Sequence, residues 1–263
     1  MLDIFWISIV LGMVSGVLAG LFGIGGGLVI VPVLAIVFKN LAFPSELIML
    51  MAVATSLAVI SLTSISSIIA HHRLGSVIWS KVVRLSPGIM LGTGLGAMLA
   101  QYISADSLRM LLVVFLVYVG LQMALQVAPK ETSINQSRIV DSSVAILIGS
   151  VSAIVGIGGG TITVPYLVKG RMLMRNAVAV SSACGLPIAL TGTLSYILMG
   201  RQTPTLPEWS LGYVYIPVFI GTGLSSVLTA PLGAKLAYKL PAKKLKRYFS
   251  ILLFVMAIKL LWS

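Results

Sequence analysis

The sequence has few charged residues: only 9% of its 263 residues are Asp, Glu, Lys or Arg. A soluble domain carries about 25%, because its surface must face water. Hydrophobic residues make up 58% of the chain, and the mean hydropathy is +1.09. So few charges cannot cover a soluble surface. We therefore expect an all-α polytopic membrane protein whose outside is covered mostly by lipid.

Cysteine and acidic residues are also scarce. The lone Cys184 excludes an internal disulfide and, without a partner, forms no metal or redox motif, so neither a cofactor nor a metal site is predicted. None of the 6 acidic residues falls securely inside an apolar run. Proton and Na⁺ pumps usually place a carboxylate there. Carboxylate-based coupling therefore has no support, and cation transport is disfavoured.

The charge that is present is mostly positive, with 18 Lys and Arg and a net charge of +12. In a soluble protein this excess would suggest nucleic-acid binding. Here the basic residues lie between apolar runs without interleaved aromatics, which favours membrane orientation and attraction to anionic headgroups or solutes. The expected partners are membrane lipid and a small anion, with no nucleic acid, and a homodimer is compatible with the sequence. We place the chain in the bacterial cytoplasmic (inner) membrane.

Long apolar runs define the expected spans, since about 20 helical residues cross a bilayer core. The runs are Ile4–Phe38, Ser45–Ala70, Val77–Ala100, Ser107–Val127, Ile139–Val168, Arg175–Met199, Trp209–Tyr238 and Leu245–Trp262.

Two of these runs are interrupted by glycines. Gly23-Ile-Gly-Gly-Gly27 divides the first run and Gly156-Ile-Gly-Gly-Gly160 divides the fifth, and a proline (Pro32, Pro165) lies five residues after the last glycine of each motif. Each glycine costs a helix about 1 kcal/mol relative to alanine. The pattern predicts that each interrupted run is a broken helix or a re-entrant hairpin.

The same order of features occurs twice along the chain, which indicates an internal duplication. We assign residues 1–129 to the first repeat, 130–135 to a linker and 136–263 to the second repeat. Each repeat would hold one broken unit followed by three transmembrane helices. The matching segments are Phe22–Leu34 with Val155–Leu167, Thr55-Ser56 with Ser181-Ser182, Trp79-Ser80 with Trp209-Ser210, and Leu95–Ala100 with Leu232–Ala237.

The orientation of the repeats depends on whether each broken unit crosses the membrane. One crossing gives parallel repeats and divides the 18 basic residues 11 to 7, whereas a return to the starting side gives inverted repeats and divides them 14 to 4. Cytoplasmic loops are enriched in Lys and Arg, so we favour inverted repeats with both termini outside the cytoplasm. The four basic residues on the outer side would be Lys39, Arg109, Arg201 and Lys259.

The two breaks are the candidate substrate site, because interrupted segments at matching places in two halves mark the binding sites of transporters. The following helices are expected to begin at Leu28 and Thr161, with their N-terminal amides and positive dipole ends directed at an anion. Tight helix packing is the alternative explanation for the glycines. The expected substrate ligands in these segments are Gly25, Gly26, Gly27, Gly158, Gly159, Gly160 and Thr161.

Matched hydroxyls in the next span of each repeat are the second group of expected substrate ligands: Thr55, Ser56, Ser181 and Ser182. A buried hydroxyl can donate to an anion without the penalty of a buried charge. The alternative, which the residues leave open, is that these groups bond backbone carbonyls or join helices. For the other hydroxyls that crowd this span, among them Thr63, Ser64 and Ser67, we expect this structural role.

Three polar residues near span ends receive structural interpretations. His71 and His72 are interpreted as a solvated helix end, with a proton relay as the alternative. Arg84 is expected to extend to the membrane surface, with attraction of the substrate as the alternative.

The motif Gly-Ile-Gly-Gly-Gly-x-x-x-Val-Pro, present at 23–32 and again at 156–165, resembles the sulfite exporter TauE/SafE family, also called the toluene sulfonate uptake permeases. The resemblance covers essentially the whole chain. It implies transport of sulfite, of organosulfonates such as sulfoacetate, or of other small organic anions, and leaves the substrate and the direction open.

We therefore hypothesise a secondary carrier or facilitator for a small sulfur-containing anion, working by alternating access around a midplane anion site. An enzyme is not expected, because the apolar runs offer hydroxyls and one Cys but no acid. A transporter of another small organic anion and a non-transporting accessory subunit are the alternatives.

Overall fold

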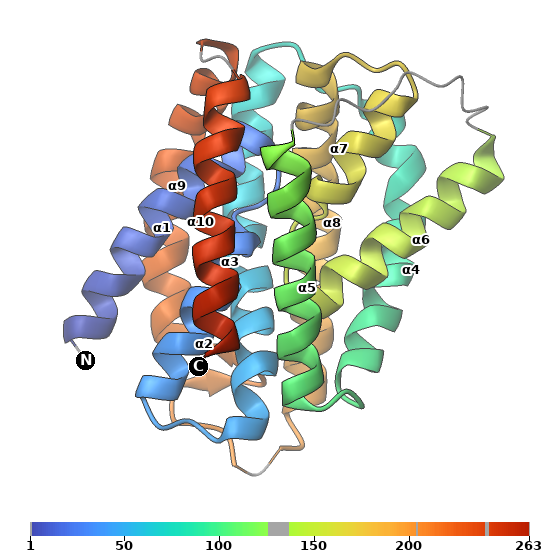
Figure 1. The fold of residues 1–263 in the computed structure, drawn as a ribbon. Coiled ribbons are helices and arrows are strands. Elements are labelled where there is room, and N and C mark those ends of the chain that lie inside the picture. Colours follow the sequence, from blue (N-terminus) through green and yellow to red (C-terminus); the bar gives the residue numbers. More distant parts are fainter. Residues whose placement is uncertain (1, 126–136, 204, 240–241, 263) are drawn as a thin grey trace.

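Figure 1 shows the computed structural model, which describes residues 2–125, 137–203, 205–239 and 242–262. The expected linker at 130–135 lies outside the described residues. The helices of the first part are α1 (Leu2–Phe22), α2 (Gly27–Asn40), α3 (Ser45–Arg73), α4 (Trp79–Ala100) and α5 (Ala105–Ala124). The elements of the second part are α6 (Arg138–Val155), α7 (Gly160–Lys169), α8 (Met174–Gly200), β1 (Ser210–Leu211), β2 (Val214–Tyr215), α9 (Ile216–Lys239) and α10 (Ala242–Leu261).

The outer surface of the helices is apolar. Within the described residues, seven helices are long and apolar enough to cross a membrane, namely α1, α3, α4, α5, α6, α8 and α9. Leu91, Val114 and Leu228 expose 65%, 59% and 76% of their surface. Large exposed apolar areas of this kind are rare on soluble monomers. The expected class, a polytopic α-helical membrane protein, is confirmed.

Both glycine motifs break their helices, as the sequence predicts. α2 and α7 begin at Gly27 and Gly160, one residue before the expected starts. The residue that precedes each helix, Gly26 or Gly159, has a φ of 79° or 74°. Only glycine adopts this left-handed conformation without a steric penalty. A side chain at either position would therefore strain the turn that redirects the chain.

One predicted span begins too early. Residues that were expected to open the span at Trp209 instead form a short antiparallel hairpin, in which Ser210 pairs with Tyr215, and α9 begins only at Ile216. Trp209 has a φ of 65°, which a right-handed helix does not allow. The hairpin turns at Gly212, also at positive φ. Trp79, its counterpart in the sequence alignment, does open a helix.

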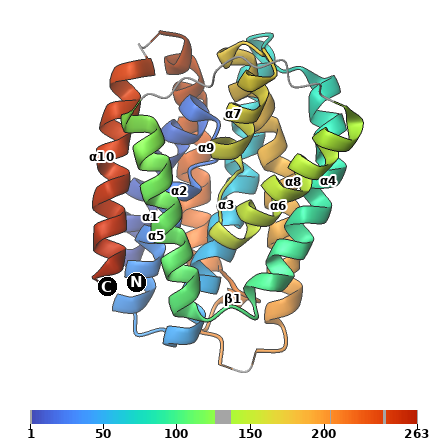
Figure 2. The ribbon, with the colours of Figure 1, turned by 45° about the vertical axis from the view of Figure 1, so that its right-hand side comes forward.

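The two halves pack against each other through matching pairs of helices. α1 of the first half lies on α9 of the second, and α6 of the second half lies on α4 of the first. α3 contacts α8 at the centre, and α5 contacts α10 (Figure 2). In Figure 1, α1 and α2 reach the end of the molecule where both termini lie, whereas α6 and α7 reach the opposite end.

Glycines spaced four residues apart allow the two outer pairs to pack closely. On α4 they are Gly88, Gly92 and Gly96, and a side-chain carbon added at Gly92 would lie 2.0 Å from the carbonyl oxygen of Ile146 on α6. On α1 they are Gly12, Gly16 and Gly20, which meet α9 in the same way. Small residues at this spacing let membrane helices approach backbone to backbone.

We predict that Gly92→Ala lowers the free energy of unfolding by about 2 kcal/mol, because the added methyl group overpacks the α4–α6 contact. The matched control is Gly94→Ala in the same helix, where nothing lies within 4 Å of the added carbon. This control should be neutral or stabilising by up to about 1 kcal/mol, since alanine favours helix. Thermal unfolding of the purified variants in detergent measures both, and equal effects would contradict the proposed contact.

Candidate functional site

The two helix breaks cross each other in the middle of the molecule. The amide of Gly158 donates to the carbonyl oxygen of Ile24 at 3.3 Å. A side-chain carbon at Gly27 would lie 2.3 Å from the oxygen of Gly156, and one at Gly160 would lie 2.2 Å from the oxygen of Gly23. Close backbone packing therefore requires glycine at these positions, whatever else the motifs do. It also means that the Gly158 amide already has a protein acceptor.

Two of the expected hydroxyl ligands hold the crossing together. Ser56 of α3 donates to the carbonyl oxygen of Gly156 at 2.8 Å, and Ser181 of α8 donates to that of Gly23 at 3.1 Å. The carbonyls at a helix end lack partners within the helix, so each serine completes the end of a broken helix in the other half. These bonds match Ser56 with Ser181, one residue away from the expected pairing of Thr55 with Ser181.

Thr55 serves a different element. Its hydroxyl oxygen accepts a hydrogen bond of 3.0 Å from the backbone amide of Tyr215 in β2. The side chain of Thr55 is completely buried. Thr55 therefore joins α3 to the β-hairpin.

A small crevice beside the crossing is lined by hydroxyls; we call it the hydroxyl crevice. Ser67 and Ser182 line it with 2% and 5% of their surface exposed, and neither hydroxyl oxygen has a hydrogen-bond partner within the described residues. A buried polar group without a partner costs about 1–3 kcal/mol. In this conformation the crevice is too small for a water molecule. Its lining consists of Ala19, Gly23, Gly25, Thr63, Ser64, Ser67, Ser182 and Gly185.

The remaining expected ligands face another side of the crossing. Gly160 and Thr161, at the start of α7, line a separate cavity of about 80 Å³ with Gln122 of α5, and the other lining residues are apolar. The Thr161 hydroxyl is buried and has no partner among the described residues. The structure therefore divides the predicted ligands, with Gly25 and Ser182 at the hydroxyl crevice and Gly160 and Thr161 at this cavity.

Sequence reasoning missed three residues of the crevice. Thr63, Ser64 and Ser67 of α3 were expected to have only structural roles, yet all three line it. Their spacing of one and three residues places them on one face of the helix. This pattern was the available signal. Thr63 does have the structural bond expected of it, to Ser226 at 2.6 Å.

The interpretation of His71 as a solvated helix end is wrong. Its side chain is 1% exposed, and Nε2 lies 3.1 Å from the carbonyl oxygen of Gly20 on α1. The long helix α3 carries it past the end of the apolar surface of α1, where the two helices contact. His72 does remain exposed, and its Nδ1 accepts a hydrogen bond from the indole of Trp79 at 3.3 Å.

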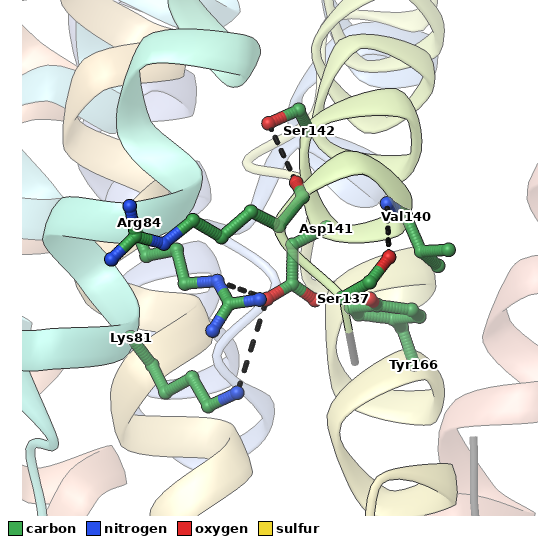
Figure 3. A network of polar contacts seen from close by, with 8 residues as sticks. Lys81, Arg84, Ser137, Val140, Asp141, Ser142 and Tyr166 are labelled. Atoms are coloured by element: carbon green, nitrogen blue, oxygen red, sulfur yellow. Dashed lines mark hydrogen bonds and ion pairs between the residues drawn. The ribbon is translucent and has the colours of Figure 1, made fainter. Parts of the chain in front are cut away.

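A buried acid was also missed. Asp141 in the first turn of α6 is 1% exposed. Arg84 Nε lies 2.5 Å from one of its carboxylate oxygens and Lys81 Nζ lies 3.9 Å from the same oxygen, while the hydroxyl of Tyr166 donates to the other oxygen (Figure 3). The prediction that no acid lies inside an apolar run is wrong, because the close α4–α6 contact covers this carboxylate. Arg84 pairs with it and does not simply extend to the membrane surface.

These features define a multi-pass α-helical membrane protein whose two broken helices meet in a polar centre. The family model of the sulfite exporter TauE/SafE matches residues 8–260, and the chain belongs to this family of membrane transporters.

Three curated relatives agree with this assignment. A probable membrane transporter protein of Haemophilus influenzae is 36% identical over 97% of this chain and 97% of its own length. Another of Methanocaldococcus jannaschii is 27% identical over 96% and 94%, and one of Xylella fastidiosa is 29% identical over 95% and 92%. No solved structure matches the chain.

We predict that Ser56→Ala and Ser181→Ala each lower the free energy of unfolding by about 1–2 kcal/mol, because each leaves a buried carbonyl without its donor. The control is Ser61→Ala in α3, whose hydroxyl bonds Ala58 within the same helix. Its effect should stay within about 0.5 kcal/mol. Thermal unfolding in detergent provides the comparison, and a control as damaging as Ser56→Ala would argue against a special role for the crossing.

Proposed function

We propose that the protein is a secondary carrier or facilitator that moves a small sulfur-containing anion, such as sulfite or a sulfoacetate-like organosulfonate, across the bacterial inner membrane. The observation that carries this proposal is the hydroxyl crevice, where the buried hydroxyls of Ser67 and Ser182 lack partners directly beside the crossing of the two breaks. A ligand with acceptor oxygens would satisfy both. Membership of the transporter family supports the same function.

The chemistry of the crevice favours an anion. Its lining contains four hydroxyl side chains and no acid. The helices α2 and α7 begin at the crossing, and the first amides of a helix have no acceptor within it and carry the positive end of its dipole. A sulfite or sulfonate group has three acceptor oxygens for such donors. A cation would find no compensating charge there.

Alternating access follows from the arrangement of the two halves. We treat them as inverted repeats, because the α1–α2 unit returns to the end that holds the termini and the α6–α7 unit returns to the opposite end (Figure 1). The crevice is closed in this conformation. Movement of one re-entrant unit relative to the central pair α3–α8 would open it toward one side only.

The basic residues support an orientation for this arrangement. Lys39 ends α2, Arg109 lies in α5 near its start, and Arg201 and Lys259 lie at the ends of α8 and α10. All four elements reach the end of the molecule that holds the termini (Figure 1). The richer opposite end is then the cytoplasmic one.

The decisive test is flux of labelled sulfite and sulfoacetate into proteoliposomes, with acetate and chloride as comparison anions. We expect saturable flux that is selective for a sulfur anion, since the site offers several converging donors. Selective flux of acetate would favour a carrier for another small organic anion. A folded protein without flux of any of the four would instead favour the accessory-subunit alternative.

A variant links flux to the crevice. We predict that Ser182→Ala raises the KM for the transported anion about tenfold, since one good hydrogen bond to a charged ligand contributes roughly 1.5–3 kcal/mol. Ser86→Ala is the control, because its hydroxyl bonds the carbonyl of Val82 within its own helix. Its KM should stay within about twofold of the parent. An unchanged KM in the folded Ser182→Ala variant would exclude this crevice as the binding site.

A further inference from the structure

The ion network at the end of α4 is more than a simple pair. Three donor groups converge on the single carboxylate of Asp141: the guanidinium of Arg84, the ammonium of Lys81 and the hydroxyl of Tyr166 (Figure 3). Two positive charges face one negative charge, so the cluster retains an excess positive charge. Donors arranged in this way around one oxyanion form a site that fits other oxyanions.

The cations are accessible, whereas the carboxylate is not. The side chains of Lys81 and Arg84 are 24% and 32% exposed, and that of Asp141 is 2% exposed. Lys81 stands 3.9 Å from the carboxylate oxygen, which is longer than a charged hydrogen bond of about 2.7–2.9 Å. An anion arriving from this end therefore reaches the two cations before it meets the acid.

The four residues are divided between two units that could separate. Lys81 and Arg84 belong to α4, whereas Asp141 and Tyr166 both belong to the α6–α7 unit. If this unit moves away from α4, the carboxylate keeps the Tyr166 hydroxyl as a partner. The cations of α4 lose their carboxylate and are left without that counter-charge, which is costly for groups that are partly buried.

We propose that Lys81 and Arg84 form a binding station for a small oxyanion at this end of the protein, and that Asp141 occupies the station as a built-in competitor in the present conformation. The proposal rests on the proposed function, because the transported anion is the oxyanion that would exchange with Asp141. An arriving anion takes over the cations of α4 as the α6–α7 unit leaves them. The station thereby couples arrival of the anion to opening of the path at this end.

The test is direct binding of sulfite to the purified full-length protein by calorimetry at low ionic strength. Asp141→Asn removes the competing charge and is expected to tighten sulfite binding about tenfold. Adding Lys81→Gln to that variant should abolish the gain. The matched control is Asp106→Asn, which removes an equal charge from the surface pair with Arg109 and should leave the affinity within about twofold. Unchanged or weaker binding by folded Asp141→Asn would overturn the proposal.

A second variant covers the case in which Asp141→Asn does not fold. Lys81→Gln alone leaves the contact between Arg84 and Asp141 in place, and we expect it to raise the KM for sulfite flux about fivefold with kcat within about twofold. Lys81→Arg should restore the KM. A purely structural network would instead lower protein yield and kcat with KM unchanged, which would reject the station. Absence of flux in the unmodified protein would refute the proposed function, whereas the calorimetric comparison would still decide the station.

Discussion

The fold depends on burying two stretches of non-helical backbone inside a membrane protein. Such backbone is tolerated at membrane depth only where protein or a water-filled cavity satisfies its polar groups. Here each half supplies what the other lacks: Ser56 bonds the carbonyl at the break of the second half, Ser181 bonds the one of the first, and the amide of Gly158 bonds Ile24. Neither half could satisfy its own break in this way, so the two halves must fold against each other.

This mutual dependence accounts for the distribution of satisfied and unsatisfied hydroxyls. Thr63 bonds Ser226 across the α3–α9 contact, and Ser56 and Ser181 are occupied at the crossing. Ser67 and Ser182, buried as deeply, have no partner among the described residues. Hydroxyls that only joined helices would follow the first pattern. The second pattern, confined to one side of the crossing, is the one that a closed binding site produces.

The sequence was sufficient to predict what depends on local pattern, and insufficient where distant elements set the outcome. Glycine runs disrupt a helix wherever they occur, so both breaks were located to within one residue of the helix starts. The role of a serine on α3 depends on how α3 is aligned with α8, which no local pattern encodes, and the pairing of Thr55 with Ser181 was therefore off by one. Likewise Arg84 and Asp141 meet only because α4 packs on α6. A matching Trp-Ser pair also proved weak, since Trp79 opens a helix and Trp209 precedes a hairpin.

The two halves share a backbone plan but not their charges. In the motif alignment Asp141 corresponds to Ser8, which bonds the carbonyl of Ile4 in its own helix, so within the described residues this network occurs at one end of the molecule only. A fixed charge at one end cannot drive net transport, because it changes no concentration gradient. It does change how strongly that end attracts an anion and how fast the anion arrives. The asymmetry therefore bears on the affinity and rate at each face, while the direction of net flux must come from the gradient of the anion or of a coupled ion.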